Sequence, residues 1–208
     1  MHKIVYLSLG SNLGDRAANL RLALEKLGEL GTIGSVSAFY ETEPVGLTSQ
    51  PWFLNCAAKL DTEKMPRQLI AGILNLEQAM GRQRKQKNGP RIIDIDILLF
   101  GTSVIDTHSL TVPHPRLHER RFVLEPLAEI APDVRHPVFK QTIRELRDSL
   151  PAVGHHEGDQ GSRARDRGEH QLRHPDGVMH RDALRGRNVR VAKEFPGQPA
   201  RALPARPL

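Results

Sequence analysis

Six apolar segments constrain the fold of this chain, because their hydrophobic periods follow the order strand, helix, strand, strand, helix, strand. Apolar residues that recur every three or four positions predict helices, and short β-branched or alternating runs predict strands. The segments are residues 4–9, 20–30, 33–40, 53–60, 69–80 and 91–100. Asp15 can cap the first helix, and Pro66 fits the first turn of the second. This order predicts the ferredoxin-like βαββαβ arrangement, an α+β fold in which two helices pack on one face of an antiparallel sheet.

The strand predicted over residues 91–100 places two carboxylates in an otherwise apolar run, Arg-Ile-Ile-Asp-Ile-Asp-Ile-Leu-Leu-Phe. Because side chains alternate along a strand, the odd-numbered residues from Ile93 to Leu99 should face the helices, and Asp94 and Asp96 the open side. Buried carboxylates are costly unless they are paired or bound to metal. Two of them about 7 Å apart suit Mg²⁺ with substrate phosphates. An ion network with nearby arginines is an equally good interpretation of this strand taken alone.

The loop before this strand is strongly cationic. Five of the eleven residues 81–91 are Lys or Arg, and Arg91 at the strand entrance would offer phosphate a fixed cation. The loop could close on a metal-bound polyphosphate, or it could be a solvated charged loop; the adjacent aspartates favour closure. Glu77 lies at the edge of the apolar stripe of the second helix. It could pair with Arg82 or Lys85, or it could face the substrate, and the sequence favours neither.

The chain beyond this strand divides into a short extension and a tail. Residues 110–113 predict a strand, residues 122–130 a helix, and residues 143–150 a last amphipathic helical segment. Residues 155–208 are rich in Arg, Gly, Pro and His, and carry 11 Lys and Arg against 7 Asp and Glu, a net +4 of the chain's +6. We therefore expect a catalytic domain over residues 1–154 and a disordered basic tail. The positive charge is weak evidence that the folded part binds nucleic acid.

Cysteine usage and the N-terminus both indicate a cytoplasmic protein. Cys56 is the only cysteine, so no disulfide can form within the chain, which fits a reducing compartment. The first residues run directly into a strand-like segment and lack the long apolar core of a signal peptide. No apolar run approaches the length needed to cross a bilayer. We expect no association with a membrane.

Several separated motifs resemble those of the 6-hydroxymethyl-7,8-dihydropterin pyrophosphokinase family of folate biosynthesis. The motifs are residues 7–15 (LSLGSNLGD), 39–46 (FYETEPVG), 50–55 (QPWFLN), 77–84, 87–98 (KNGPRIIDIDIL) and 112–115 (VPHP). They fall in the order and spacing of that family over residues 4–150. The resemblance implies a transferase that moves diphosphate from its co-substrate ATP to the hydroxymethyl group of the pterin, releasing AMP, with two Mg²⁺ ions.

The resemblance also implies a role for individual residues. Asp94 and Asp96 would hold the two Mg²⁺ ions, and Arg82 and Arg91 would steady the transferring group. The residues implied for pterin binding are Thr42, Pro44, Val45, Phe53, Asn55, Asp94 and Phe122. The residues implied for ATP binding are Glu77, Arg82, Arg84, Arg91, Ile97, Thr111, His114 and Arg120. Asn88 stands where many members have Trp, so a ring that helps to close the loop is missing here.

Two other functions compete with this one. An RNA-binding module of the same topology is suggested by the positive charge, but such modules stack bases on aromatic residues of the central strands. Here Asp94 and Asp96 would instead repel phosphate in the absence of metal. A degraded relative could bind ATP or pterin without catalysis. We expect a monomer whose partners are ATP and the pterin, and no nucleic acid.

Overall fold

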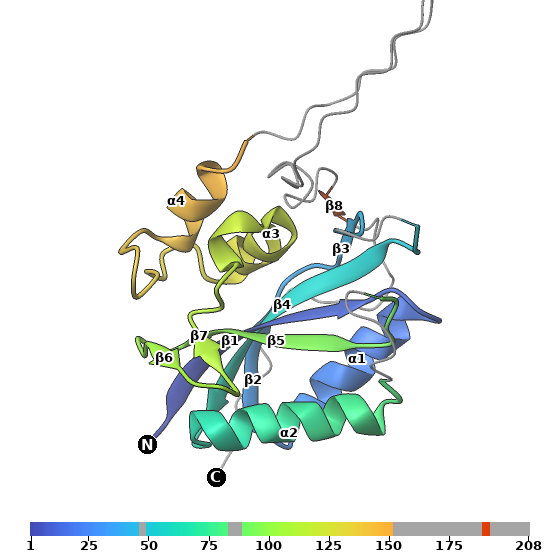
Figure 1. Ribbon diagram of the computed structural model, residues 1–208, viewed down its shortest axis with the longest axis horizontal. Coiled ribbons are helices and arrows are strands. Elements are labelled where there is room, and N and C mark those ends of the chain that lie inside the picture. The colour runs from blue at the N-terminus through green and yellow to red at the C-terminus, as the bar shows by residue number, and fades with distance from the viewer. Residues whose placement is uncertain (46–48, 83–88, 152–188, 192–208) are drawn as a thin grey trace, which may run out of the picture.

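A six-stranded antiparallel sheet forms the centre of the molecule (Figure 1). The computed structural model describes residues 1–45, 49–82, 89–151 and 189–191. The strands and helices are β1 (Lys3–Ser11), α1 (Arg16–Leu27), β2 (Thr32–Val36), β3 (Tyr40–Thr42), β4 (Phe53–Thr62), α2 (Pro66–Ala79), β5 (Asp94–Phe100), β6 (Ile105–Asp106), β7 (Thr111–Val112), the 3₁₀ helix η1 (Leu117–Glu119), α3 (Arg121–Ile130), α4 (Ile143–Asp148) and β8 (Val189–Val191). The sheet order is β5-β1-β4-β3-β8, and β2 also pairs with β4. This confirms the predicted α+β fold.

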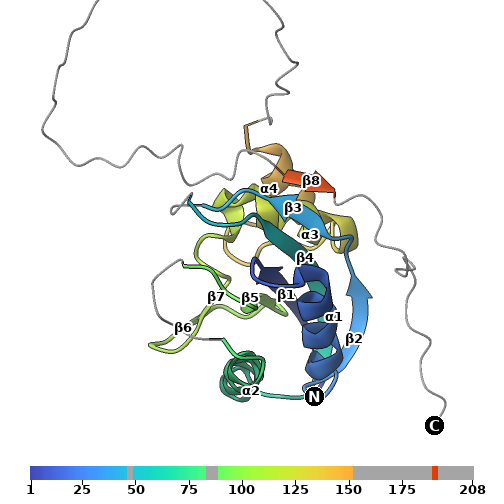
Figure 2. The same cartoon turned by 90° about the vertical axis from the view of Figure 1, so that its right-hand side faces the viewer.

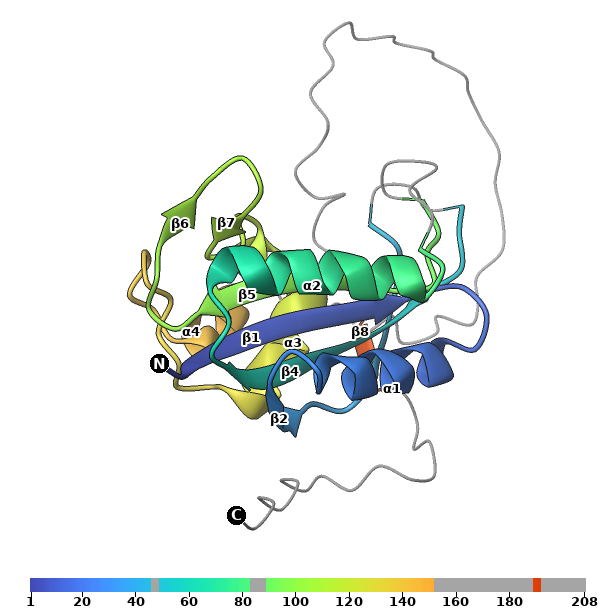
Figure 3. The same cartoon turned by 90° about the horizontal axis from the view of Figure 1, so that it is seen from below.

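Local signals in the sequence position the two helices as expected. The Asp15 carboxylate accepts a hydrogen bond from the Ala18 amide at 2.9 Å and caps α1, and Pro66 occupies the first turn of α2. Gly81 follows α2 with φ of 87°, a conformation that glycine adopts readily. α1 ends at Leu27, before the end of the helical segment predicted over residues 20–30. Both helices lie on one face of the sheet, as Figure 3 shows from below.

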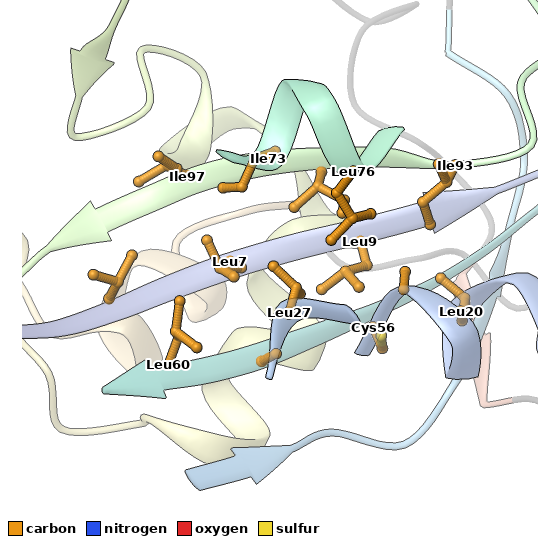
Figure 4. Packing of buried hydrophobic residues seen from close by; sticks show 14 of the residues in the cluster. Leu7, Leu9, Leu20, Leu27, Cys56, Leu60, Ile73, Leu76, Ile93 and Ile97 are labelled. Carbon is orange, nitrogen blue, oxygen red and sulfur yellow. The ribbon is translucent and has the colours of Figure 1, made fainter. Parts of the chain in front are cut away.

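Apolar side chains cover both faces of the sheet. Leu7 and Leu9 of β1 point toward the helices and pack with Leu20 of α1 and Ile73 of α2 (Figure 4). A second cluster on the opposite face joins Tyr6 to α3 and α4. The sheet is therefore sandwiched between helices, and Figure 2 shows α3 and α4 near β3 and β8. The predicted open face is open only toward the aspartate end of β5, where the helices of the second cluster do not cover Asp94 and Asp96, which stay partly exposed.

A β-bulge changes the predicted alternation of β5. The register passes from Tyr6 opposite Leu99 to Leu7 opposite Ile97, which leaves Leu98 as an extra residue. Beyond the bulge the side chains exchange faces, so Leu99 packs in the second cluster with Leu98. The prediction that all odd-numbered residues from Ile93 to Leu99 face the helices is therefore wrong at Leu99.

The strand predicted over residues 33–40 is interrupted. β2 ends at Val36 and β3 begins at Tyr40. Between them the Ser37 amide still donates to the Ala57 carbonyl of β4 at 2.9 Å, whereas the next amide, that of Ala38, bonds to a side chain of α3. The Ala38 amide donates to the Glu129 carboxylate of α3 at 3.0 Å, and the Ser37 hydroxyl accepts from the Ala57 amide at 2.9 Å. The interruption directs β3, and the loop after it, toward the aspartate end of the sheet.

One short part of the expected tail is ordered. Val189–Val191 form β8, which pairs antiparallel with β3, and the sequence analysis did not expect a strand there. The other residues of 155–208 lie outside the described part of the chain, so the prediction of disorder stays a prediction for them. Among the described helices, none has the length and apolar character needed to cross a membrane.

Candidate active site

A pocket opens at the aspartate end of the sheet, with about 750 Å³ of empty space that is continuous with the solvent. Its lining residues are Ser8, Gly10, Thr42, Glu43, Val45, Gln50, Phe53, Asn55, Arg91, Asp94, Asp96, Arg116, Arg120 and Phe122. They come from four adjacent strands (β5, β1, β4 and β3), from the loops after β3 and before β5, from the segment that leads into α3, and from α3 itself. The pocket combines two phenyl rings, three carboxylates and three arginines, which suits a flat heterocycle joined to an anion.

The wall predicted for the pterin is assembled in the structure. Thr42, Val45, Phe53, Asn55 and Phe122 line the pocket, whereas Pro44 is buried beside it and is not a lining residue. Asn55 Nδ2 donates to Thr42 Oγ1 at 2.6 Å, and this buried bond fixes the orientation of the amide. A Cβ at Gly10 would lie 2.6 Å from Asn55 Oδ1. A side chain at position 10 would therefore displace the amide from this wall.

Asp94 takes part in an ion network. Its two carboxylate oxygens lie 2.6 Å from Arg82 Nη2 and 2.8 Å from Arg91 Nη2. Arg82 also donates to Glu77, whose carboxylate accepts from the Ile95 amide at 2.7 Å. Burial raises the pKa of Glu77 against the opposing charge of Arg82. The pairing of Glu77 with Arg82 is thus confirmed, and its contact with ATP stays a prediction.

Asp96 differs from Asp94 in its charge environment. Within the described part of the chain, the basic side chain that approaches the Asp96 carboxylate is His114, whose Nε2 lies 4.0 Å away, and the Asp96 side chain is 42% exposed. Burial of the carboxylate and the charge of Asp94 raise the pKa of Asp96 to about 6. Asp96 therefore carries negative charge that the protein compensates only in part, as expected of a carboxylate that awaits a cation.

His114 is neutral at pH 7. Burial, followed by the charges of Arg120 and Arg116, lowers its pKa to about 4. His114 Nδ1 accepts from the Arg116 amide at 3.1 Å. The proton of the neutral ring is therefore on Nε2, which is the atom nearest Asp96.

The donor set suits Mg²⁺ better than a metal that needs a protein cage. No group of three or more His, Cys, Asp and Glu side chains gathers at one point in the described ranges. Mg²⁺ characteristically uses one or two carboxylates and completes its shell with water and substrate phosphates. Asp94 and Asp96 provide such a pair, on adjacent outward positions of β5.

The arginines of the pocket lie against its aromatic residues. The guanidinium carbon of Arg91 is 5.1 Å from the centre of the Phe53 ring, and that of Arg120 is 5.6 Å from the Phe122 ring. Arg91 Nε, Arg116 Nη2 and Arg120 Nε are buried, with no hydrogen-bond partner among the described residues. Sequence reasoning did not single out Arg116. Its position two residues after His114 was the available signal.

The remaining predicted ATP contacts are not gathered at this pocket. The Ile97 side chain is buried in the cluster under α2, so only its main chain could approach a nucleotide. The Thr111 hydroxyl donates to Asp106 at 3.2 Å. Arg84 lies outside the described residues. Ser8 and Gly10, which the sequence analysis missed, are opposite Asp96 and Asp94 in the β1–β5 register, and strand pairing could have found them.

Asn12 joins the loops around the pocket. Its side chain is buried, donates through Nδ2 to Gln50 Oε1 and the Pro51 carbonyl at 3.1 Å, and accepts from the Arg91 amide at 2.7 Å. The main-chain N–H of Asn12 also donates to the Arg91 carbonyl at 3.1 Å. One residue at the end of β1 thus connects the segment before Phe53 to the segment that carries Arg91.

Comparison with known proteins assigns the family. The sequence profile of the 7,8-dihydro-6-hydroxymethylpterin-pyrophosphokinase (HPPK) family matches residues 6–132. The chain belongs to this family. The family predicted from the motifs is confirmed, and the HPPK match includes β1 through α3, and with them every lining residue of the pocket.

Curated relatives of the HPPK chain fall into two groups. The 2-amino-4-hydroxy-6-hydroxymethyldihydropteridine pyrophosphokinase of Aquifex aeolicus is 44% identical over 69% of this chain and 89% of its own length, and that of Methylorubrum extorquens is 46% identical over 72% and 94%. The folic acid synthesis protein of Schizosaccharomyces pombe is 43% identical over 74% of this chain. This chain spans only 21% of that protein, and 23% of the Dictyostelium discoideum relative.

Solved structures confirm the fold. The crystal structure of Plasmodium falciparum HPPK-DHPS with pteroate superposes on 71% of this chain with a TM-score of 0.59, at 20% identity, and the match covers 42% of that protein. At this identity the similarity bears on the fold alone.

Proposed function

We propose that this chain transfers diphosphate from ATP to the hydroxymethyl group of 6-hydroxymethyl-7,8-dihydropterin, which yields AMP and the pterin diphosphate, in folate biosynthesis. The observation that carries the proposal is the single pocket in which the Phe53–Phe122 wall meets Asp94, Asp96 and the arginines. The pyrophosphokinase names of the relatives that match over nearly their full length support it.

The pterin side of the pocket offers stacking and polar contacts. Phe53 and Phe122 can stack on the planar pterin ring. Their cation–π contacts with Arg91 and Arg120 keep these two arginines close to the bound pterin. Asn55, oriented by Thr42, can donate and accept along one edge of the heterocycle. The main chain of residues 42–45 would add contacts to the ring. A pterin bound in this way would direct its hydroxymethyl group toward Asp94 and Asp96.

The phosphate side works by charge and position. In the reaction the hydroxyl oxygen of the pterin bonds to the β-phosphorus of ATP, the bond from that phosphorus to the α,β-bridging oxygen breaks, and AMP leaves. The two Mg²⁺ ions that Asp94 and Asp96 would hold supply neutralisation of the phosphates and a lower pKa for the hydroxyl. Arg82 and Arg91, which form ion pairs with Asp94 in this structure, can stabilise the negative charge of the group being transferred. Arg84, His114, Arg120, Thr111 and the main chain of Ile97 would position the nucleotide.

The competing RNA-binding function has less support. Tyr6 of the inner strand β1 and Phe100 of the edge strand β5 are both buried. A platform for stacking bases is therefore missing from these strands. The monomeric state, the cytoplasmic location and the limit of the catalytic domain near residue 154 remain predictions. Truncation after Gly154 with retained turnover would support that limit.

The decisive assay measures AMP release from ATP and Mg²⁺, with and without the hydroxymethyl pterin. AMP formation that depends on the pterin is the expected result, and its absence would remove the proposal. A chain that binds ATP or pterin tightly and forms no AMP would instead be the non-catalytic relative.

A further inference from the structure

We propose that Arg116 binds the diphosphate during transfer, as the third cation of a cradle with Arg91 and Arg120. The inference rests on the proposed function and adds a residue to it. Arg116 lies just before η1, and all three arginines line the pocket that also contains Asp94 and Asp96. We call these three residues the arginine cradle.

Arg116 lines the pocket, and its contacts leave one guanidinium nitrogen without a partner among the described residues. Its Nε lies 3.4 Å from Glu119 Oε2, a long contact. Its Nη2 is buried and has no partner among the described residues, and the same holds for Nε of Arg91 and of Arg120. Buried cationic donors without acceptors are costly. Three residues that each carry such a donor line one pocket, which favours an anion with several oxygens as the acceptor.

Mutual repulsion within the arginine cradle points the same way. Burial and the charge of Arg116 lower the pKa of Arg120, and the charge of Arg116 also helps to lower that of His114. A fold that brings these cations together in a shared pocket gains most when a polyanion enters it. Guanidinium groups bind phosphate oxygens in pairs, which gives such a cradle geometric selectivity as well as charge.

The location of the arginine cradle identifies which phosphates it binds. Arg91 and Arg120 lie over Phe53 and Phe122, so the cradle adjoins the ring wall of the pocket. The phosphates nearest a stacked pterin are the two that are transferred. Arg116 should therefore act on the diphosphate as it moves from nucleotide to pterin, and affect binding of the nucleoside part much less.

The alternative is that Arg116 only stabilises the turn before α3 through Glu119. Its main chain donates to His114 Nδ1, and Arg116→Gln and Arg116→Lys both keep that N–H, so the bond does not confuse the test. Glu119→Gln removes the acidic partner and keeps Arg116. Arg144→Gln is a matched control, because Arg144 forms an exposed pair with Asp133 at 3.2 Å and does not line the pocket.

The test combines turnover with binding of inorganic diphosphate in the full-length protein. Arg116→Gln should lower kcat/KM by ~10²-fold and diphosphate affinity by ~10-fold, with the melting temperature unchanged. Arg116→Lys should recover part of both losses, and Glu119→Gln and Arg144→Gln should behave like wild type. If Glu119→Gln loses as much as Arg116→Gln, or if Arg116→Gln matches wild type in both measurements, the inference fails. Should Arg116→Gln not fold, equal diphosphate affinity of wild type and Arg116→Lys would overturn it.

These outcomes separate the inference from the proposed function. Wild-type protein without pterin-dependent AMP release refutes the proposed function, whatever Arg116 does. Active wild-type protein with an unaffected Arg116→Gln variant refutes only the role of Arg116.

Discussion

Replacing Asp96 with asparagine should raise the stability of the protein while it abolishes diphosphate transfer. The side chain keeps its shape and loses its charge. In the folded protein that charge is opposed by burial and by Asp94, which together raise the pKa of Asp96 from 3.8 to about 6. Without a bound metal, the ionised Asp96 carboxylate should therefore destabilise the folded protein.

The magnitude follows from the shift of the pKa. About two pKa units correspond to ~3 kcal/mol in the free energy of unfolding. Because the side chain is 42% exposed, solvent screens part of this effect, and we expect ~1 kcal/mol. For a chain of this length that amounts to a rise of ~3 °C in melting temperature.

The pH dependence has a defined sign. The folded-state pKa is raised, so protonated Asp96 contributes stability below the unfolded pKa of 3.8, and this contribution is lost as pH rises through about 6. Asparagine does not titrate. The stability difference between Asp96→Asn and wild type should be near zero at pH 4 and reach its full value above pH 6.

Thermal unfolding from pH 4 to pH 8, with and without Mg²⁺, provides the measurement. Mg²⁺ should stabilise wild type and leave Asp96→Asn unchanged. Asp133→Asn is the control, since Asp133 is exposed and pairs only with Arg144 among the described residues. A large fall in the melting temperature of Asp96→Asn, together with retained AMP release, would refute the reasoning and favour a structural ion network.

Three further predictions concern the surroundings of the pocket. Gly10→Ala places a methyl group 2.6 Å from Asn55 Oδ1 and should raise the pterin KM ~10-fold or more with little change in the ATP KM; equal changes in both would contradict the assignment of this wall. Burial raises the pKa of the Cys56 thiol, so an aromatic disulfide reagent at pH 8 should react only after denaturation; rapid reaction of the native protein would contradict this. Glu129→Gln weakens the hydrogen bond that the Tyr40 hydroxyl donates, and should lower the free energy of unfolding in denaturant by ~1 kcal/mol. An unchanged denaturation midpoint would contradict this.

The sequence predicted the helices and strands well because their hydrophobic periods are strong and because the residues that begin and end the helices lie close to the helix ends. Asp15, Pro66 and Gly81 act within a few residues of their own helix ends. The bulge at Leu98 was not predictable in this way, because it arises from the register between two strands that are far apart in the chain. The break between β2 and β3 likewise depends on Glu129, about ninety residues away.

The candidate site shows the same division. Asp94 and Asp96 stood out because charges interrupt an apolar run, and the motifs implied most of the pterin wall. The sequence favoured neither the ion network nor the metal site for these two aspartates. In the structure Asp94 is paired with arginines, as in an ion network. Asp96 is not paired at hydrogen-bond distance within the described ranges, as expected of a metal ligand. Arg116 was missed because its meaning depends on burial and on neighbouring cations.

The bonds of Asn12 have a consequence for how such a pocket can change over evolutionary time. The segments on either side of the pocket use the same buried amide, so neither can be altered independently of the other. Substitutions at Gln50 and around Arg91 should therefore covary among relatives, although the two positions share no period and lie forty residues apart. Enzymes that specialise toward a different ring would be expected to alter both segments together, or to replace Asn12 first.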